Sequence, residues 1–306
     1  MNSAPRLCTA AGPTVGFIGI GSMGAPMARN LAVDGTHVLV HDLDPDRARP
    51  LLCDSIEWVD SPAAMARRSE LIVSMVWDDA ALESTVFGSR GILAVEEFGG
   101  CLVDLSTTSV SGSLRVAAAL GRHGAGFLDG GVIGGGAPAA RAGRSPIVLA
   151  GARELFDRHA AVLRRLGSCD YVGRQGLAKL VKVLNNLLVG VVTAANAEAL
   201  SLGVAAGVRL PEMVRALSES PVASTVLRSY MNGYVRDRQY GQGLIGHTLM
   251  AKDLSLACKL ADELAAPGLF AGLARQLYLQ LARDMGGDLP FPSAFDYFTR
   301  TGRTAV

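Results

Sequence analysis

Three glycines in the pattern GxGxxG constrain the fold of this chain more than any other feature. Gly19, Gly21 and Gly24 directly follow the apolar run Val15–Ile18, and a helical pattern begins immediately after them. In this setting the first two glycines allow a tight turn and close approach of a ligand, and the third lets the helix pack against the strand. Phosphates bind at such a helix start because its N–H groups lack partners. The sequence therefore predicts a dinucleotide site at Gly19, Gly21, Ser22, Met23 and Gly24.

An acidic residue at the end of the next strand pattern supports this prediction. The run His37–His41 leads into Asp42, at about the spacing from Gly19 that is typical of the acid binding the ribose hydroxyls. A carboxylate there accepts the ribose 2′-OH and repels a 2′-phosphate, which favours NAD, with NADP still possible. Two alternatives remain open. Asp44 and Asp46 mark a turn, so some of these acids could have a capping role, and the nearby Arg47 and Arg49 could favour a 2′-phosphate. A glycine-rich turn that binds no ligand is the alternative for the whole motif.

Short β-rich runs alternate with helical patterns from Thr14 to about Gly176. The runs are mostly apolar, as in strands buried on both faces of a parallel sheet. The predicted strands are Val15–Ile18, His37–His41, Leu71–Val76, Cys101–Asp104, Gly126–Asp129 and Ile147–Ala150. After Gly176 only helical patterns follow. The sequence thus predicts an α/β fold, in which a Rossmann-type doubly wound parallel sheet is followed by an all-helical C-terminal domain.

The same patterns divide the 306 residues into three parts. We expect a flexible tail over 1–13, a dinucleotide-binding domain over 14–176, and a helical substrate and dimerisation domain over 177–306. With 29 Lys plus Arg against 28 Asp plus Glu, the chain has no excess charge that favours nucleic acid or an anionic membrane as a partner. The five scattered cysteines form no CxxC pair, so neither a disulfide framework nor a metal site is expected.

Two stretches bear on where the protein works. The N-terminal residues lack an apolar core long enough for a signal peptide. The most apolar stretch, 180–206, contains polar residues that argue against a membrane span: Lys182, Asn185, Asn186, Asn196 and Glu198. We therefore expect a soluble, cytoplasmic protein. So much apolar surface on one helix also favours a homo-oligomer, a dimer or a tetramer.

The polar residues of this apolar stretch gather on one side of the predicted helix. At about 100° per residue, Asn185, Asn186, Thr193 and Asn196 all fall within about 60° of Lys182. Burying such groups is costly unless they bind something, so we interpret the stripe as the edge of an active site. A polar interface or a solvated face is the alternative. Lys179, on the other side of the stripe, is the competing lysine.

A lysine in a cleft suits proton transfer, because desolvation lowers the pKa of a lysine towards neutrality. Lys182 is predicted to give a proton to a carbonyl oxygen as a hydride arrives and to remove it in the reverse direction. Asn186 would orient the same oxygen. The predicted substrate-binding residues are Ser106, Thr107, Gly134, Gly135, Gly136 and Asn185. Ser106 and Thr107 follow a strand end, where open α/β sheets bind ligands, and the glycines present N–H groups to a carboxylate. Met75, Val76 and Thr107 are predicted cofactor contacts, and Ser109 is predicted to cap the next helix.

Over essentially its whole length the chain resembles the β-hydroxyacid dehydrogenase family. The opening GFIGIGSMGAPMARNL is similar to the cofactor motif of that family, and Asp104–Ser109 is similar to its serine–threonine loop. GRQGLAKLVKVLNN, residues 173–186, resembles its catalytic motif and implies that Lys182 is the catalytic lysine. Met250–Leu254 resembles its KDL segment, which implies that Lys252 lies near the cofactor.

The resemblance implies an NAD(P)-dependent dehydrogenase of a small 3-hydroxy acid. One departure bears on the substrate: where the family supplies a serine hydroxyl to the substrate carboxylate, neither Ile133 nor Gly134 has one. The substrate is therefore expected to differ from the commonest one of the family. Three alternatives remain: a decarboxylating dehydrogenase of the 6-phosphogluconate type, an imine reductase, and a non-catalytic NAD-binding module.

Overall fold

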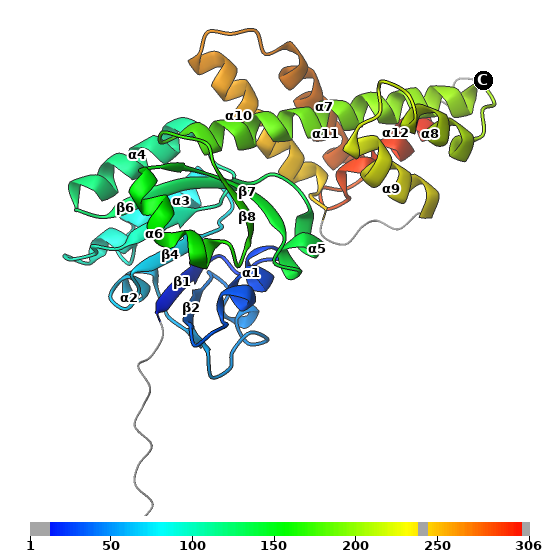
Figure 1. Ribbon diagram of the computed structural model, residues 1–306. Helices are drawn as coiled ribbons and strands as arrows, with labels where there is room; N and C mark the ends of the chain where they lie inside the picture. The colour runs from blue at the N-terminus through cyan, green and yellow to red at the C-terminus, as the bar shows by residue number, and fades with distance from the viewer. Residues whose placement is uncertain (1–12, 238–243, 302–306) are drawn as a thin grey trace, which may run out of the picture. The chain divides into compact units, whose positions relative to one another are not determined.

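The computed structural model describes residues 13–237 and 244–301 (Figure 1). The chain divides into two compact units between Lys182 and Val183, inside the long helix α7 (Leu177–Ala205). The first unit is an α/β layer structure and the second is helical.

One sheet organises the first unit. Its strands are β1 (Thr14–Ile18), β2 (His37–His41), β3 (Ile56–Trp58), β4 (Leu71–Ser74), β5 (Cys101–Asp104), β6 (Gly126–Val132), β7 (Ser145–Gly151) and β8 (Gly167–Tyr171). Their order across the sheet is β3-β2-β1-β4-β5-β6-β7-β8. Neighbouring strands are parallel except β6 and β7. This mostly parallel sheet confirms the predicted α/β class.

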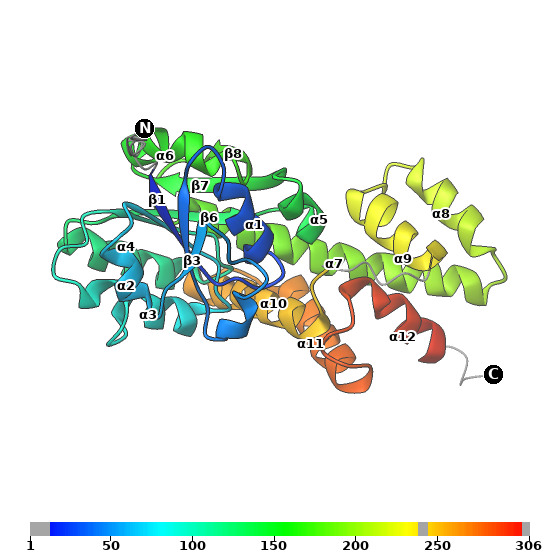
Figure 2. The ribbon, with the colours of Figure 1, turned by 90° about the horizontal axis from the view of Figure 1, so that it is seen from below.

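Helices cover both faces of the sheet, as Figure 2 shows. On one face lie α1 (Gly24–Leu31), α5 (Gly136–Arg141) and α6 (Arg153–Leu163), and on the other α2 (Pro62–Ala66), α3 (Asp79–Phe87) and α4 (Val110–Arg122). Successive strand residues alternate between the two layers: Phe17 packs with Met27, whereas Ile18 packs with Met65. Full burial of such a side chain stabilises the fold by about 1.5–3 kcal/mol. Burial on both faces explains why the strands contain so few polar residues.

The structure corrects two expectations about the sheet. The strands β3 and β8 were not predicted, because β3 has only three residues and β8, at the edge, carries exposed Ser168 and Asp170. The sheet was predicted to be parallel, and among its neighbouring pairs only β6 and β7 depart from this, because β7 runs antiparallel to β6. The connection between them holds only the six-residue helix α5, and it leads the chain straight back alongside β6. A short return of this kind gives antiparallel neighbours, whereas a parallel crossover needs a longer connection.

The second unit is built from α7 together with five further helices in the described part of the chain. They are α8 (Leu210–Ser218), α9 (Asn232–Asp237), α10 (His247–Glu263), α11 (Leu269–Asp284) and α12 (Ala294–Thr301), and a π-helical turn, η3 (Val226–Met231), precedes α9. The segments between α7 and α8, between α10 and α11, and between α11 and α12 contain glycine or proline, at Gly207, Pro267 and Gly268, and 286–292. The core of this unit includes Leu200, Met250, Leu254, Tyr278 and Phe295.

Candidate active site

The glycine loop between β1 and α1 has a backbone conformation that leaves no room for a side chain at Gly19 or Gly24. Gly19 has a φ of 89°, and a Cβ there would lie 2.1 Å from the carbonyl oxygen of Met75. A Cβ on Gly24 would lie 1.9 Å from the carbonyl oxygen of Gly19. Above Gly21, by contrast, the nearest atom is Nη1 of Arg47 at 3.8 Å. This open space, next to the unpaired N–H groups with which a helix begins, suits the pyrophosphate of a dinucleotide.

Asp42, which directly follows β2, is hydrogen-bonded to this loop. Its Oδ2 accepts the N–H of Ile20 at 2.9 Å, and its Oδ1 accepts the N–H of Asp44 at 3.0 Å. Each carboxylate oxygen has two lone pairs, so acceptor capacity for ribose hydroxyls remains. Asp44 accepts the N–H of Asp46 at 3.0 Å, which confirms the capping alternative for Asp44. Nη1 of Arg47 lies 3.7 Å from Oδ1 of Asp42.

The other predicted residues of the first unit follow β4, β5 and β6, which come after β1 in the order of the sheet. Because β1, β4, β5 and β6 are parallel and adjacent, their carboxyl ends lie along one edge. Met75 and Val76 follow β4, Ser106 and Thr107 follow β5, and β6 ends at Val132. Ligands of open α/β sheets bind beyond this edge.

Ser106 fastens the loop after β5 to the loop after β4. It is 1% exposed, and its Oγ donates to Oδ1 of Asp104 at 2.5 Å and accepts the N–H of Val76 at 2.8 Å. A hydroxyl has one proton, and here Asp104 receives it. Substrate binding by Ser106 stays a prediction, and Thr107, half-buried beside it, is the more open of the two. Ser109 accepts the N–H of Gly112 at 3.0 Å, which confirms its predicted capping of α4.

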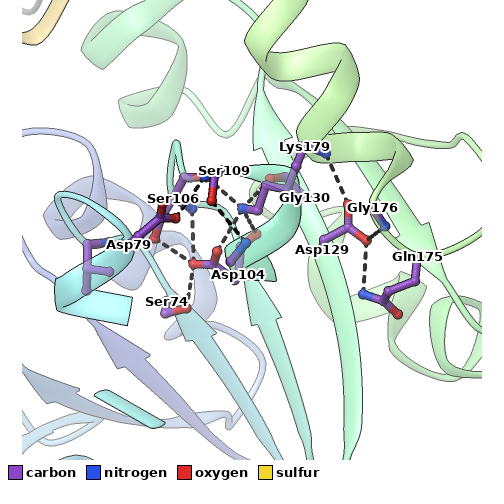
Figure 3. Close-up of polar contacts among 12 residues, drawn as sticks. Ser74, Asp79, Asp104, Ser106, Ser109, Asp129, Gly130, Gln175, Gly176 and Lys179 are labelled. Atoms are coloured by element: carbon purple, nitrogen blue, oxygen red, sulfur yellow. Dashed lines mark hydrogen bonds and ion pairs between the residues drawn. The ribbon is translucent and has the colours of Figure 1, made fainter. Parts of the chain in front are cut away.

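A buried lysine joins the ends of β5 and β6, as Figure 3 shows. Lys179 is fully buried, and its Nζ donates to the carbonyl oxygens of Asp104 at 2.8 Å, Ser106 at 2.6 Å and Gly130 at 2.8 Å. Oδ2 of Asp104 lies 2.7 Å from the same nitrogen. The three protons of an ammonium are thus matched by three carbonyls, and the carboxylate adds an ion pair. The sequence indicated Lys179 only as an alternative to Lys182 for proton transfer, and not as a buried structural cation.

Asp129 secures the start of α7 (Figure 3). Its Oδ1 accepts the N–H of Gly176 at 2.7 Å and Nε2 of Gln175 at 3.0 Å, and its Oδ2 accepts the N–H of Lys179 at 3.0 Å. These N–H groups have no acceptor within the helix itself. Burial raises the pKa of the Asp129 carboxyl, and the hydrogen bonds together with the Lys179 charge oppose that rise. Sequence reasoning missed both roles, although two aspartates ending apolar strands signal a need for a buried partner.

Lys182 lies one turn further along α7, at the end of β6. It is half-buried, and its Nζ donates to the carbonyl oxygen of Val132 at 2.6 Å. Its stem lies on Gly131, where an added Cβ would come within 2.7 Å of the Lys182 Cβ. The glycines Gly134, Gly135 and Gly136 follow directly, the last two with left-handed φ of 78° and 54°.

The predicted residues of the helical unit meet around one aspartate. Asn186 donates to Oδ2 of Asp253 at 2.6 Å, and its own Oδ1 accepts Nδ2 of Asn185 at 3.0 Å. Nζ of Lys252 lies 2.9 Å from Oδ1 of Asp253. Asn185, Asn186 and Lys252 therefore form one polar cluster with Asp253. Asp253 belongs to the KDL segment, but sequence reasoning gave it no role.

Comparison with known proteins gives matches along almost the entire chain. The NAD binding domain of 6-phosphogluconate dehydrogenase matches residues 14–173, and the NAD-binding domain of NADP-dependent 3-hydroxyisobutyrate dehydrogenase matches residues 176–297. Mitochondrial 3-hydroxyisobutyrate dehydrogenase of Mus musculus is 32% identical over 290 residues, which cover 92% of this chain and 86% of that protein. The 2-(hydroxymethyl)glutarate dehydrogenase of Eubacterium barkeri is 30% identical, covering 86% of this chain and 87% of that protein.

A solved structure extends the likeness to the fold. The 3-hydroxyisobutyrate dehydrogenase of Mycobacterium tuberculosis, solved with L-serine, superposes with a TM-score of 0.83 at 24% identity, covering 93% of this chain and 98% of that one. The parallel sheet, the glycine loop and these matches define an NAD(P)-dependent oxidoreductase. The chain belongs to the β-hydroxyacid dehydrogenase family.

Proposed function

We propose that this enzyme transfers a hydride between NAD(P) and a small 3-hydroxy acid or its keto or semialdehyde form, with Lys182 as the general acid and base. The observation that carries the proposal is the place of the Lys182 amine at the end of β6, on the sheet edge that also bears the glycine loop. Relatives about 30% identical over most of their length are named for hydroxy acids, 3-hydroxyisobutyrate and 2-(hydroxymethyl)glutarate.

The residues of the chain divide the work around the reacting oxygen. Lys182 removes the hydroxyl proton in oxidation and returns it in reduction, a contribution that is typically about 10²–10⁴-fold. Asn186, four residues further along α7, orients that oxygen, and Asn185 contacts the substrate beside it. Ser106 and Thr107, with the N–H groups of the three glycines after Ile133, hold the carboxylate, and the missing hydroxyl at Ile133 and Gly134 favours a substrate other than the commonest one of the family. The nicotinamide, when bound, supplies the hydride acceptor or donor.

Lys182→Met tests the assignment of the base. Turnover of the best substrate in a panel of 3-hydroxy acids, followed by nicotinamide absorbance, should fall about 10²–10⁴-fold. NADH affinity should persist, because the glycine loop and Asp42 are unchanged. Lys259→Met is the matched control, since this lysine is exposed and its Nζ lies 3.9 Å from Oε1 of Glu263, at the outer limit of an ion pair. Near-normal turnover by the Lys182 variant contradicts the proposal.

We also propose that the enzyme prefers NAD to NADP. Asp42 faces the position of the ribose hydroxyls with acceptor capacity to spare, and a 2′-phosphate there would meet a negative charge. Arg47 offsets part of that charge, which keeps NADP usable. Dissociation constants for the two cofactors, measured side by side, test this preference. Equal or tighter binding of NADP rules it out.

We further infer a homo-oligomer, a dimer or a tetramer, that works in the cytoplasm. Helix α7 is long and apolar enough to cross a membrane, and only 22% of its most apolar window is buried within the chain. Leu184, Leu188 and Leu202 are 43%, 63% and 65% exposed, at spacings that place them on one side of the helix. A second copy would cover this face symmetrically.

Lys182 and Asn186 interrupt the helix with polar groups that lipid does not satisfy. The free thiols of Cys53, Cys101, Cys169 and Cys258 suit a reducing compartment.

Charges placed on this face of α7 test the oligomer. The double variant Leu188→Glu/Leu202→Glu should lower the mass measured by light scattering to that of a smaller species. Leu43→Glu, at a leucine that is 95% exposed in the other unit, serves as the control and should leave the mass unchanged. A wild-type protein that is already monomeric contradicts the proposal, and fractionation of cells tests the location.

A further inference from the structure

Lysine is the rare cation of this protein. The chain has 4 lysines against 25 arginines. Among the residues that the structure describes, Lys179 is the one lysine or arginine buried from solvent. Removing a charge from water is costly, and replacing a buried ion pair by apolar residues is often neutral or stabilising. Stability alone therefore does not explain a lysine at this position.

The contacts of Lys179 show what the charge achieves. One nitrogen binds carbonyl oxygens from the end of β5, from the loop after it and from β6. These carbonyls belong to residues 49–75 positions away from Lys179 in sequence. Oδ1 of Asp104 also accepts a hydrogen bond from Oγ of Ser74 at 2.8 Å, so the end of β4 is connected to the same network. Three strand ends and the first turn of α7 are thereby held at fixed distances.

A lysine suits this place better than an arginine. Three acceptors converge within 2.6–2.8 Å of one nitrogen, and an ammonium is a compact charge with three donors. A guanidinium spreads its donors over a planar fork and does not direct three of them to one point. The choice of cation therefore follows the geometry of the carbonyls.

The position of Lys182 depends on the same contacts of Lys179 with β5 and β6. Lys182 follows Lys179 by one turn of α7, and its amine reaches the carbonyl of Val132, two residues beyond the Gly130 carbonyl that Lys179 holds. Asp129 caps the first turn of the same helix. The strand end and the helix can therefore shift relative to each other only if the buried contacts of Lys179 break.

We propose that Lys179 is a positioning residue, whose buried ammonium ties β5 and β6 to α7 and so places the amine of Lys182 over Gly131 and Val132. The consequence for turnover rests on the proposed function of Lys182. The structural part of the proposal stands without it. The three protons of the Lys179 amine are donated to the carbonyls of Asp104, Ser106 and Gly130, so none is left for a substrate.

Two variants separate positioning from stability. Lys179→Met removes the charge and leaves Asp104 unpaired, and Lys179→Met/Asp104→Asn removes both charges. The single variant should lose thermal stability, and the double variant should regain most of it. Turnover per cofactor-binding site should nevertheless stay at least tenfold below wild type in the double variant, with NADH affinity within about threefold. Lys259→Met is the control for loss of a lysine. Recovery of turnover together with stability overturns the proposal.

A second measurement does not depend on activity. With four lysines in the chain, nuclear magnetic resonance of a lysine-labelled sample resolves each one, and single substitutions assign them. In the wild type, the Lys179 ammonium protons should exchange slowly with water, because all three are buried and hydrogen-bonded. In the folded double variant the Lys182 signal should move, while the Lys259 signal stays in place. Fast exchange at Lys179, or an unmoved Lys182 signal, overturns the proposal. If both expectations hold but no 3-hydroxy acid is turned over, the proposed function fails and the positioning role stands.

Discussion

Two stretches of the same sheet edge are fixed by opposite means. At β1 and β2 the glycine loop is set by backbone atoms in close contact, where side chains are excluded. At β5 and β6 the strand ends are set by buried charged side chains, Lys179 and Asp104, with Asp129 on the helix start. The first arrangement leaves open space for a ligand. The second is buried from solvent, and we propose that it places the amine of Lys182.

The largest expected effect comes from adding a methyl group to the glycine loop. Gly19→Ala combines a left-handed φ with a contact of 2.1 Å to the Met75 carbonyl, so both the loop and the end of β4 must shift. Gly35→Ala is the matched control, because Gly35 has a φ of 76° but no atom within 4 Å of the added Cβ. The control should lose about 1–2 kcal/mol of unfolding free energy from the φ alone. Gly19→Ala should lose several times as much and weaken NAD binding at least 100-fold. Equal losses of unfolding free energy in the two variants would show that the contact between the new Cβ at position 19 and the Met75 carbonyl costs nothing to relieve.

The next comparison is between the two aspartates that end the strands. Asp104→Ala leaves a buried ammonium without its counter-charge, and denaturant unfolding should report a loss of about 3–5 kcal/mol. Asp42→Ala removes two hydrogen bonds, from the N–H groups of Ile20 and Asp44, and should cost about 1–2 kcal/mol. Cofactor binding should respond in the reverse order, with Asp42→Ala weakening NAD more than NADP. If Asp42→Ala proves the more destabilising variant, the contrast between the two stretches is wrong.

The difference between these stretches also explains how much of the fold was predictable. Gly19, Gly21, Gly24 and Asp42 lie within 24 consecutive residues, and their roles depend on local chain geometry that a motif records. The apolar runs predicted six strands for a similarly local reason, since burial on both faces excludes polar residues. The direction of β7 was not predictable in this way, because it depends on whether the chain after β6 turns straight back beside that strand or crosses over the sheet first.

Part of the site lies beyond what local patterns predict. The helical period selected Lys182, Asn185 and Asn186 from one stretch of sequence. The partners that fix these residues, Asp253 for Asn186 and Val132 for Lys182, lie 67 and 50 residues away. The same holds for Lys179, whose distance in sequence from Asp104 is 75 residues. A buried charge on an apolar helix predicts that a partner exists, but only the fold identifies which one.

The smallest expected effect is the pH dependence that Asp129 gives to the second stretch. Burial raises the pKa of this carboxyl above its usual 3.8, so the folded chain holds the proton more tightly than the unfolded chain. The contribution of Asp129 to the free energy of unfolding therefore falls as the pH rises from about 4 through the folded-state pKa, and it is constant above that value. Asp129→Asn should lack this fall, although it is less stable overall because it loses a cap of α7. Denaturant unfolding of both proteins across this range, with the exposed Asp46→Asn as the charge control, measures the difference in slope. A wild-type curve that rises relative to the Asn variant would mean that the hydrogen bonds from Gly176 and Lys179 outweigh burial.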